Sequence, residues 1–133
     1  MKPSNLIFPK SQKGSLNYSI KLDKFIFGNY ALMALNSCRI KASHLEIIQL
    51  AIKRQLKKEG KLIFRVFPHT PVTKKPSEVR MGKGKGSVAF YSTKLQVGSF
   101  ILEVLCLNKT KAIKALNIAA SKLPLATKII TKS

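Results

Sequence analysis

The chain has 133 residues, 45% of them hydrophobic, which fits one domain with a modest core. It carries 25 Lys and Arg against five Asp and Glu, and a formal net charge of +20 would strongly repel itself without a polyanionic partner. The longest apolar run, 30–35, is far shorter than the roughly 18 residues of a spanning helix, which excludes a transmembrane protein and favours a nucleic-acid partner.

The N-terminus lacks the patterns of targeting peptides. The apolar run 6–8 is interrupted by Pro9 and is shorter than the roughly 7–15 residues of a signal-peptide core. The first arginine is Arg39, so the segment is not an Arg-rich transit peptide either. We therefore expect the protein to work in the compartment where it is made.

Residues 1–19 are predicted to form an extended basic tail. They show no helical or strand periodicity and contain two prolines, Gly14 and three lysines: Lys2, Lys10 and Lys13. Disorder in the isolated protein is an equal alternative, because basic tails often become ordered only on their polyanion. Residues 20–133 are expected to form a single α+β domain.

Two strands are predicted after the tail. Residues 20–27 are β-prone and roughly alternating, and the apolar segment 30–35 follows the turn-prone pair Gly28 and Asn29.

A helix is predicted over 44–59. Ser43 and Glu46 have the spacing of an N-terminal capping box, and Gly60 is placed for a left-handed C-terminal cap. The helical period puts Leu45, Ile48, Ile52 and Leu56 on one buried stripe. Its last two turns carry Lys53, Arg54, Lys57 and Lys58, which either form a solvated face at the negative helix end or contact phosphates.

The segment 61–67, KLIFRVF, is predicted to be a strand that Pro68 ends. Alternation puts Leu62, Phe64 and Val66 on the core face and Arg65 on the opposite face. Arg65 is therefore expected to be free for a partner.

Residues 68–86 form a long basic loop in this prediction. They contain three prolines, three glycines and five Lys or Arg against one Glu, with no periodicity. The loop closes with RMGKGKGS, in which glycines permit positive φ and close approach to a sugar-phosphate chain while Arg80, Lys83 and Lys85 supply charge. Its order does not match a Walker A loop, and a strand rather than a helix follows, so the dinucleotide fingerprint also fails.

The C-terminal part is predicted to hold three strands and one helix. Strands 87–95 and 99–107 are joined by a hairpin at 96–98, with Phe90 in the core. Asn108 caps a helix over 109–122, and a last strand over 125–131 closes the sheet. The predicted buried side of that helix consists of Ala112, Leu116, Ala119 and Leu123.

No catalytic or metal constellation is visible. The five carboxylates are scattered, and His44 and His69 are isolated from each other and from any nucleophile. Cys38 and Cys106 have neither CxxC spacing nor neighbouring His, so we expect free buried thiols. The prediction is a non-enzymatic protein without cofactor, metal or small-molecule substrate.

Four stretches resemble the sixteenth family of large-subunit ribosomal proteins, the L16 type of bacteria and organelles. They are GKLIFRVFPHTPVTKKPSEVRMGKGKGS (60–87), GSFILEV (98–104), AASKLPLATKII (119–130) and, more weakly, FGNYALMAL (27–35). The resemblance covers about three quarters of the chain. It implies an α+β fold of the α/β-hammerhead type, with two helices packed on a mostly antiparallel sheet.

The same resemblance implies a function. Family members bind large-subunit rRNA among neighbouring large-subunit ribosomal proteins, and their basic loop points toward the peptidyl transferase region and the A-site tRNA, supporting assembly and translation. The loop contacts it implies at matching positions are Lys75, Arg80, Met81, Gly82, Lys83, Gly84, Lys85 and Gly86. To these we add Lys74, Arg65, Lys53, Arg54 and Lys57 as basic candidates for rRNA or tRNA contact.

Two alternatives remain open at this stage. One is a free-standing cationic module that binds nucleic acid or a membrane surface through generic charge, and the other is a phosphate-binding enzyme. The excess of 21 Lys over 4 Arg favours an A/T-rich genome such as an organelle's. We therefore expect a ribosome of the mitochondrial matrix, with a plastid or the bacterial cytoplasm as alternatives.

Overall fold

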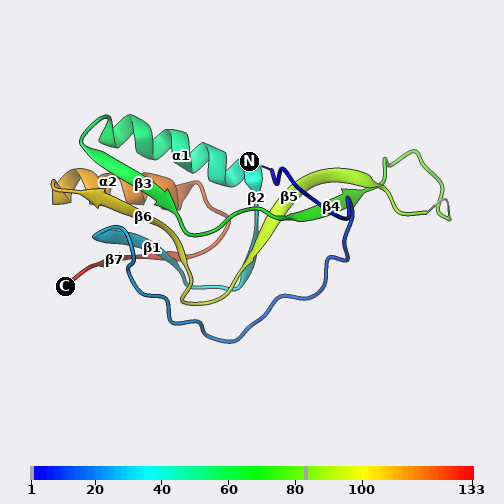
Figure 1. Ribbon diagram of the computed structural model, residues 1–133, viewed down its shortest axis with the longest axis horizontal. Helices are drawn as coiled ribbons and strands as arrows, with labels where there is room; N and C mark the ends of the chain where they lie inside the picture. Colours follow the sequence, from blue (N-terminus) through cyan, green and yellow to red (C-terminus); the bar gives the residue numbers. More distant parts are fainter. Residues whose placement is uncertain (1, 83) are drawn as a thin grey trace.

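Two antiparallel sheets and two helices make up the structure, a computed structural model that describes residues 2–82 and 84–133 (Figure 1). The elements follow in the order β1 (Tyr30–Ala34), β2 (Cys38–Lys41), α1 (Ala42–Leu56), β3 (Gly60–Phe64), β4 (Thr70–Lys74), β5 (Ser87–Leu95), β6 (Phe100–Cys106), α2 (Lys109–Ser121) and β7 (Thr127–Thr131). The predicted α+β class is confirmed, with two sheets in place of one.

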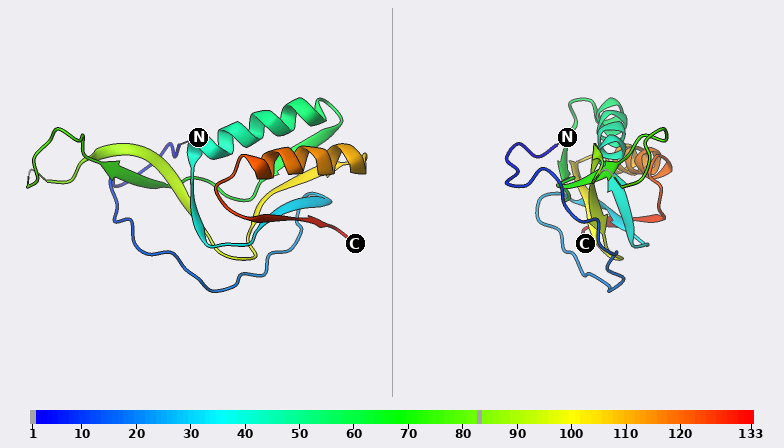
Figure 2. Two further views of the ribbon diagram at one scale, coloured as in Figure 1. Left: turned by 180° about the vertical axis from the view of Figure 1, so that it is seen from behind. Right: turned by 90° about the vertical axis from the view of Figure 1, so that its right-hand side faces the viewer.

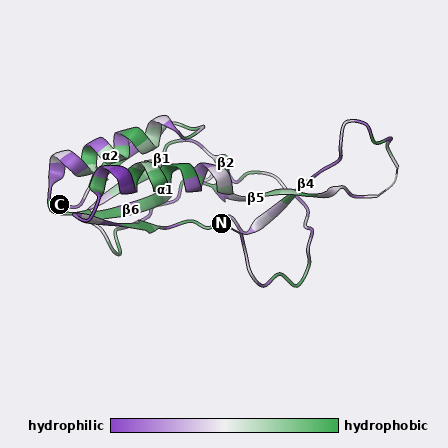
Figure 3. Cartoon of the chain, turned by 90° about the horizontal axis from the view of Figure 1, so that it is seen from above, coloured by the Kyte–Doolittle hydropathy of each residue, from purple (hydrophilic) through white to green (hydrophobic). Residues whose placement is uncertain are grey.

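The larger sheet has the strand order β3-β6-β1-β7, and both helices lie on one of its faces (Figures 1 and 2). The predicted helix stripes are confirmed, because all eight of their side chains are buried in one core with Leu32, Leu102 and Val104 of the sheet. Both helices carry apolar and polar bands, whereas β6 is apolar apart from Glu103 (Figure 3). Full burial stabilises each large aliphatic side chain by about 1.5–3 kcal/mol, so this helix–sheet layer holds the fold.

The smaller sheet, β2-β5-β4, carries the chain away from the helices. Its strand β4 lies inside the region predicted to be an irregular loop, so that prediction is wrong for Thr70–Lys74. Pro71 is tolerated there because β4 is an edge strand, where a missing N–H does not interrupt the sheet. The loop is thereby shortened to residues 75–86.

The predicted hairpin at 96–98 is also wrong, because β5 and β6 belong to different sheets. Gly98 donates its N–H to the Ala34 carbonyl, so the segment crosses from one sheet to the other. Its φ is +87°, and a Cβ there would lie 1.9 Å from the Lys21 carbonyl oxygen. Both the positive φ and the close contact favour glycine at this position.

The helix ends differ from prediction in α1 and agree in α2. Helix α1 begins one residue before Ser43, and the Lys41 amide donates to His44 Nδ1 in place of the predicted serine and glutamate capping box. At its other end Lys57 takes the positive φ of 53°, whereas Gly60 begins β3, where a Cβ would lie 2.9 Å from a backbone oxygen. In α2 the Asn108 side chain accepts from the Lys111 amide, as predicted.

Two further predictions are corrected. Residues 20–27 form no strand, and Ile20 makes only an isolated bridge to Val97. Phe90 is half-buried outside the core, with the Lys41 ammonium 4.6 Å from its ring centroid. The prediction of free buried thiols is confirmed for Cys106, whereas Cys38 is free but only half-buried.

Candidate nucleic-acid interface

The loop 75–86 projects from the far end of the β4–β5 ribbon, away from both helices (Figure 1). Lys74 pairs with Ser87, and this last pair of the ribbon forms the base of the loop. The loop's side chains are mostly exposed, and that of Met81 is 96% exposed. The sequence therefore places a bare, basic segment at one extremity of the molecule.

Glycines give this loop its backbone path. Gly82 and Gly84 have φ values of +99° and +78° with nothing within 4 Å of a Cβ position, so only backbone conformation selects glycine there. Gly86 differs, because a Cβ would lie 2.8 Å from the carbonyl carbon and oxygen of Lys74 across the ribbon. Two glycines thus shape the tip, and the third permits the strands to meet.

Five of the predicted cations fall within the sequence of the β4 end and the loop, and the structure describes four of them. Lys74, Arg80 and Lys85 are exposed and Lys75 is half-buried. Lys83 lies outside the described residues. The sequence of the loop and of the adjoining β4 holds a single carboxylate, that of Glu78, so the loop is a positively charged surface suited to phosphate oxygens.

The α1 candidates lie elsewhere. Lys53, Arg54 and Lys57 are exposed at the C-terminal end of α1, the end that points away from the loop (Figures 1 and 2). The predicted residues therefore form two separate basic regions, one at each end of the long axis.

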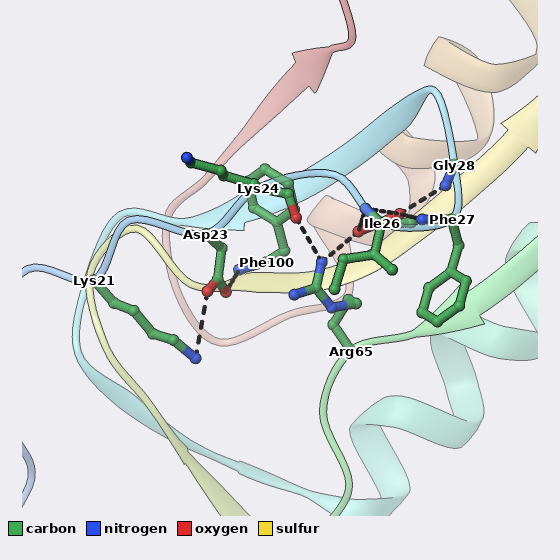
Figure 4. A network of polar contacts seen from close by, with 9 residues as sticks. Lys21, Asp23, Lys24, Ile26, Phe27, Gly28, Arg65 and Phe100 are labelled. Carbon is green, nitrogen blue, oxygen red and sulfur yellow. Dashed lines mark hydrogen bonds and ion pairs between the residues drawn. The ribbon is translucent and has the colours of Figure 1, made fainter.

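Arg65 is not free, and the expectation that it is available to a partner is wrong. Its guanidinium pairs with the buried carboxylate of Glu103 and donates to the Lys24 carbonyl at 2.9 Å (Figure 4). Alternation correctly put Arg65 off the face of Leu62 and Phe64, but that side of the chain is covered by segment 20–28. We call the Arg65–Glu103 pair and the amides of 26–28 the carboxylate clamp.

Segment 20–28 is held to the sheet by the carboxylate clamp and not by the backbone hydrogen bonds of a paired strand. The amides of Phe27 and Gly28 each donate to Glu103 Oε2 at 2.7 Å, and that of Ile26 donates to Oε1 at 3.2 Å. Nearby, Asp23 accepts from the Phe100 amide at 2.8 Å. Two acidic side chains therefore accept hydrogen bonds from backbone amides that, in a strand pair, would donate to backbone carbonyls.

The protonation of Glu103 follows from these contacts. Burial by itself raises the pKa of the carboxyl, but the amides of Gly28 and Phe27, the Arg65 guanidinium and the Ile26 amide outweigh it and hold the pKa below 4.5. Glu103 is thus a structural anion, and a lone acid in the apolar strand FILEVLC was the only sequence signal for it.

A third basic cluster was missed in the sequence. Arg39 of β2, Lys94 of β5 and Lys85 of the loop each donate to a backbone carbonyl within residues 11–15 of the tail, at 3.0, 2.9 and 2.6 Å. Lys10 returns a bond to the Lys85 carbonyl at 3.2 Å. The tail therefore follows the β2–β5–loop surface, which its own sequence does not predict because these contacts join residues far apart in the chain.

Neither helix in the described part of the chain has the length and apolarity needed to span a bilayer. Within residues 2–82 and 84–133, no three His, Cys, Asp or Glu side chains are grouped so as to hold a metal ion. What the described surface offers is distributed positive charge.

Known proteins that are similar to this chain are ribosomal, which is consistent with a basic surface suited to binding nucleic acid. The family described as ribosomal protein L16p/L10e matches residues 3–130. The chain is 40% identical to the large ribosomal subunit protein uL16 of Orientia tsutsugamushi (strain Boryong), over 99% of this chain and 98% of that one. Its identity to the uL16 proteins of Leptospira biflexa and Paracoccus denitrificans is 39% and 38%, again over at least 96% of both chains.

Proposed function

This chain belongs to the ribosomal protein L16p/L10e family, and on that premise we propose that it binds large-subunit rRNA and extends its loop toward the functional centre of the ribosome. It is a structural, non-enzymatic protein of the large ribosomal subunit, in keeping with its relatives, which are named large ribosomal subunit protein uL16. Binding of rRNA is the role that its charge of +20 supports, and contact with neighbouring ribosomal proteins follows from membership of the family.

The observation that carries the proposal is the projecting loop 75–86. It combines exposed Arg80 and Lys85 with two glycines at positive φ, and it stands clear of the helices. Such a loop can follow a folded RNA closely, because its backbone carries few obstructing side chains and its charge is offset by phosphates. We propose that it reaches the peptidyl transferase region and contacts the A-site tRNA.

The loop's role is tested by Lys83→Ala combined with Lys85→Ala. We expect the purified variant to unfold at the wild-type temperature but to slow maturation of the large subunit or accommodation of A-site tRNA. The matched control is Lys114→Ala on α2 with Lys122→Ala at its C-cap, two exposed positions whose substitution removes the same charge. Equal assembly and translation in both double variants would remove the loop from the proposal.

General rRNA binding is tested by its dependence on salt. The logarithm of the association constant should fall against the logarithm of salt concentration with a slope of about −0.7 to −0.9 for each phosphate neutralised. A slope near zero on large-subunit RNA would contradict the proposal.

The alternative, a free-standing cationic module, predicts a different behaviour in the cell. A ribosomal protein comigrates stoichiometrically with large subunits through a high-salt wash, whereas generically bound protein is released because its contacts are screened. Sedimentation followed by protein quantification therefore separates the two.

We propose the mitochondrial matrix as the location of that ribosome, with a plastid or the bacterial cytoplasm as alternatives. The support is compositional, 21 Lys against 4 Arg, while the relatives compared above are bacterial. Recovery of the protein from mitochondrial ribosomes by fractionation and mass spectrometry is the expected result, and its recovery from bacterial ribosomes alone would contradict it.

A further inference from the structure

The tail and the start of β4 border an open groove of about 670 Å³, lined by residues 5–8, 10–13 and 69–71 together with Lys94. The groove lies beside the base of the loop, to which Lys10 and Ser11 are bonded through Lys85. Figure 2 shows the N-terminal segment, in dark blue, beside this part of the ribbon. None of the groove's lining residues belongs to the set predicted to contact RNA.

Two kinds of side chain meet in the groove. Its lining residues include three lysines, Lys10, Lys13 and Lys94, together with Phe8, which is 75% exposed. Exposed aromatic rings beside lysines are the pattern with which proteins hold unpaired nucleotides, because each base offers a π-face and each phosphate a charge.

The charges of this groove have no ionic counterpart among the described residues that line it, which include neither Asp nor Glu. The Lys94 ammonium is bonded to the Ser15 carbonyl at 2.9 Å, and that of Lys85 to the Ser11 carbonyl at 2.6 Å. Carbonyl oxygens carry only partial charge, so positive potential remains in the groove. A phosphate would be the first full negative charge to enter it.

We propose that this groove binds an unpaired stretch of RNA, with phosphates held by Lys10, Lys13 and Lys94 and one base stacked on Phe8. The proposal rests on the proposed rRNA-binding function and adds a second contact region to it, separate from the loop tip. A duplex does not fit the same role, because its base faces are already stacked and unavailable to Phe8.

The bonds between tail and loop link the groove to the loop. Lys10 and Lys85 exchange contacts, each ammonium donating to a carbonyl on the other segment, so the groove wall is bonded to the base of the loop. An RNA strand that leaves the groove at Lys10 therefore meets the loop at Lys85. The groove thus orders the tail and directs the strand toward the loop.

The test measures binding of the full chain to a fluorescent single-stranded 12-nucleotide oligouridylate and to a duplex RNA of equal length. Phe8→Ala should weaken single-strand binding by roughly fivefold to a hundredfold, the range for loss of one stacked base, and leave duplex binding unchanged. Tyr18→Ala is the matched control, because Tyr18 is 74% exposed and does not line the groove. Equal single-strand affinities of these two variants would overturn the proposal.

Photocrosslinking gives an independent reading. An oligonucleotide carrying 5-bromouridine should form its adduct on the tryptic peptide that ends at Lys10, and adducts confined to peptides of residues 75–86 would overturn the groove. The rRNA salt slope is measured in parallel on the same preparations. A normal slope without a Phe8 effect removes the groove alone, whereas a slope near zero in the wild type removes the proposed function itself.

Discussion

Glu103→Gln is the sharpest perturbation of this structure, because it changes charge without changing shape. The wild-type carboxylate accepts from three successive amides and pairs with Arg65. A glutamine amide keeps one acceptor oxygen and turns an NH₂ group toward N–H donors. The substitution therefore sets donor against donor inside a fully buried site.

The expected loss of unfolding free energy depends on which contacts Arg65 keeps in the variant. Removing one partner of a buried ion pair costs about 3–5 kcal/mol. Arg65 keeps its bond to the Lys24 carbonyl and its side chain is 16% exposed, so we lower the expected loss to about 2–4 kcal/mol. For a chain of this size that corresponds to a fall in Tm of roughly 6–15 °C.

Urea unfolding at neutral pH measures this difference in free energy. The control is Glu59→Gln, which breaks an exposed pair with Lys111 and should cost no more than about 1 kcal/mol. If Glu103→Gln costs no more than Glu59→Gln does, then the carboxylate clamp does not stabilise the fold and the reasoning fails.

The pH dependence gives a second check on the same residue. The folded-state pKa of Glu103 lies below the ordinary 4.5, so its carboxylate contributes stability that is fully present above pH 4.5. That contribution is lost as pH falls through the lower folded-state pKa. The stability gap between wild type and Glu103→Gln should therefore be constant near neutrality and narrow only below pH 4.5. A gap that narrows at neutral pH would contradict this.

Three other substitutions test the packing and the turns. Asn108→Ala removes the cap of α2 and should cost about 0.5–2 kcal/mol of unfolding free energy. Ile52→Ala in the core should cost about 2–5 kcal/mol in urea unfolding, whereas Ile47→Ala, at 46% exposure, should cost far less. Gly86→Ala forces a Cβ against the Lys74 backbone and should weaken amide protection in the adjoining β4–β5 pairs, and unchanged hydrogen exchange there would contradict the packing.

Sequence predicted the elements whose cause is local. The stripe from Leu45 to Leu56, the Asn108 cap and the bounds of β5 all depend on residues within a few turns or one strand. The predictions that were wrong concern segments whose conformation depends on residues far away in the sequence. Segment 20–28 is held by Glu103, and the segment at Gly98 bonds to β1, so neither partner could be chosen from the chain around them.

The candidate interface shows the same division. Composition was sufficient to find the basic loop, because its exposed glycine and lysine pattern is visible in the local sequence, although it did not reveal that Lys85 bonds to the tail. Composition was misleading for Arg65, whose charge is used inside the protein, and it did not reveal Arg39 and Lys94, which become neighbours only through the β2–β5 pairing.

The strand order has a consequence for how this chain is made. Strand β1 lies between β6 and β7, so Tyr30 pairs with both Val104 and Thr131. Neither partner has been synthesised when β1 leaves the exit tunnel, and contacts of such sequence separation form late and slowly. The main sheet cannot close until almost the whole chain has emerged, and the basic N-terminal segment lacks its partners Lys85 and Lys94 until those residues have been synthesised.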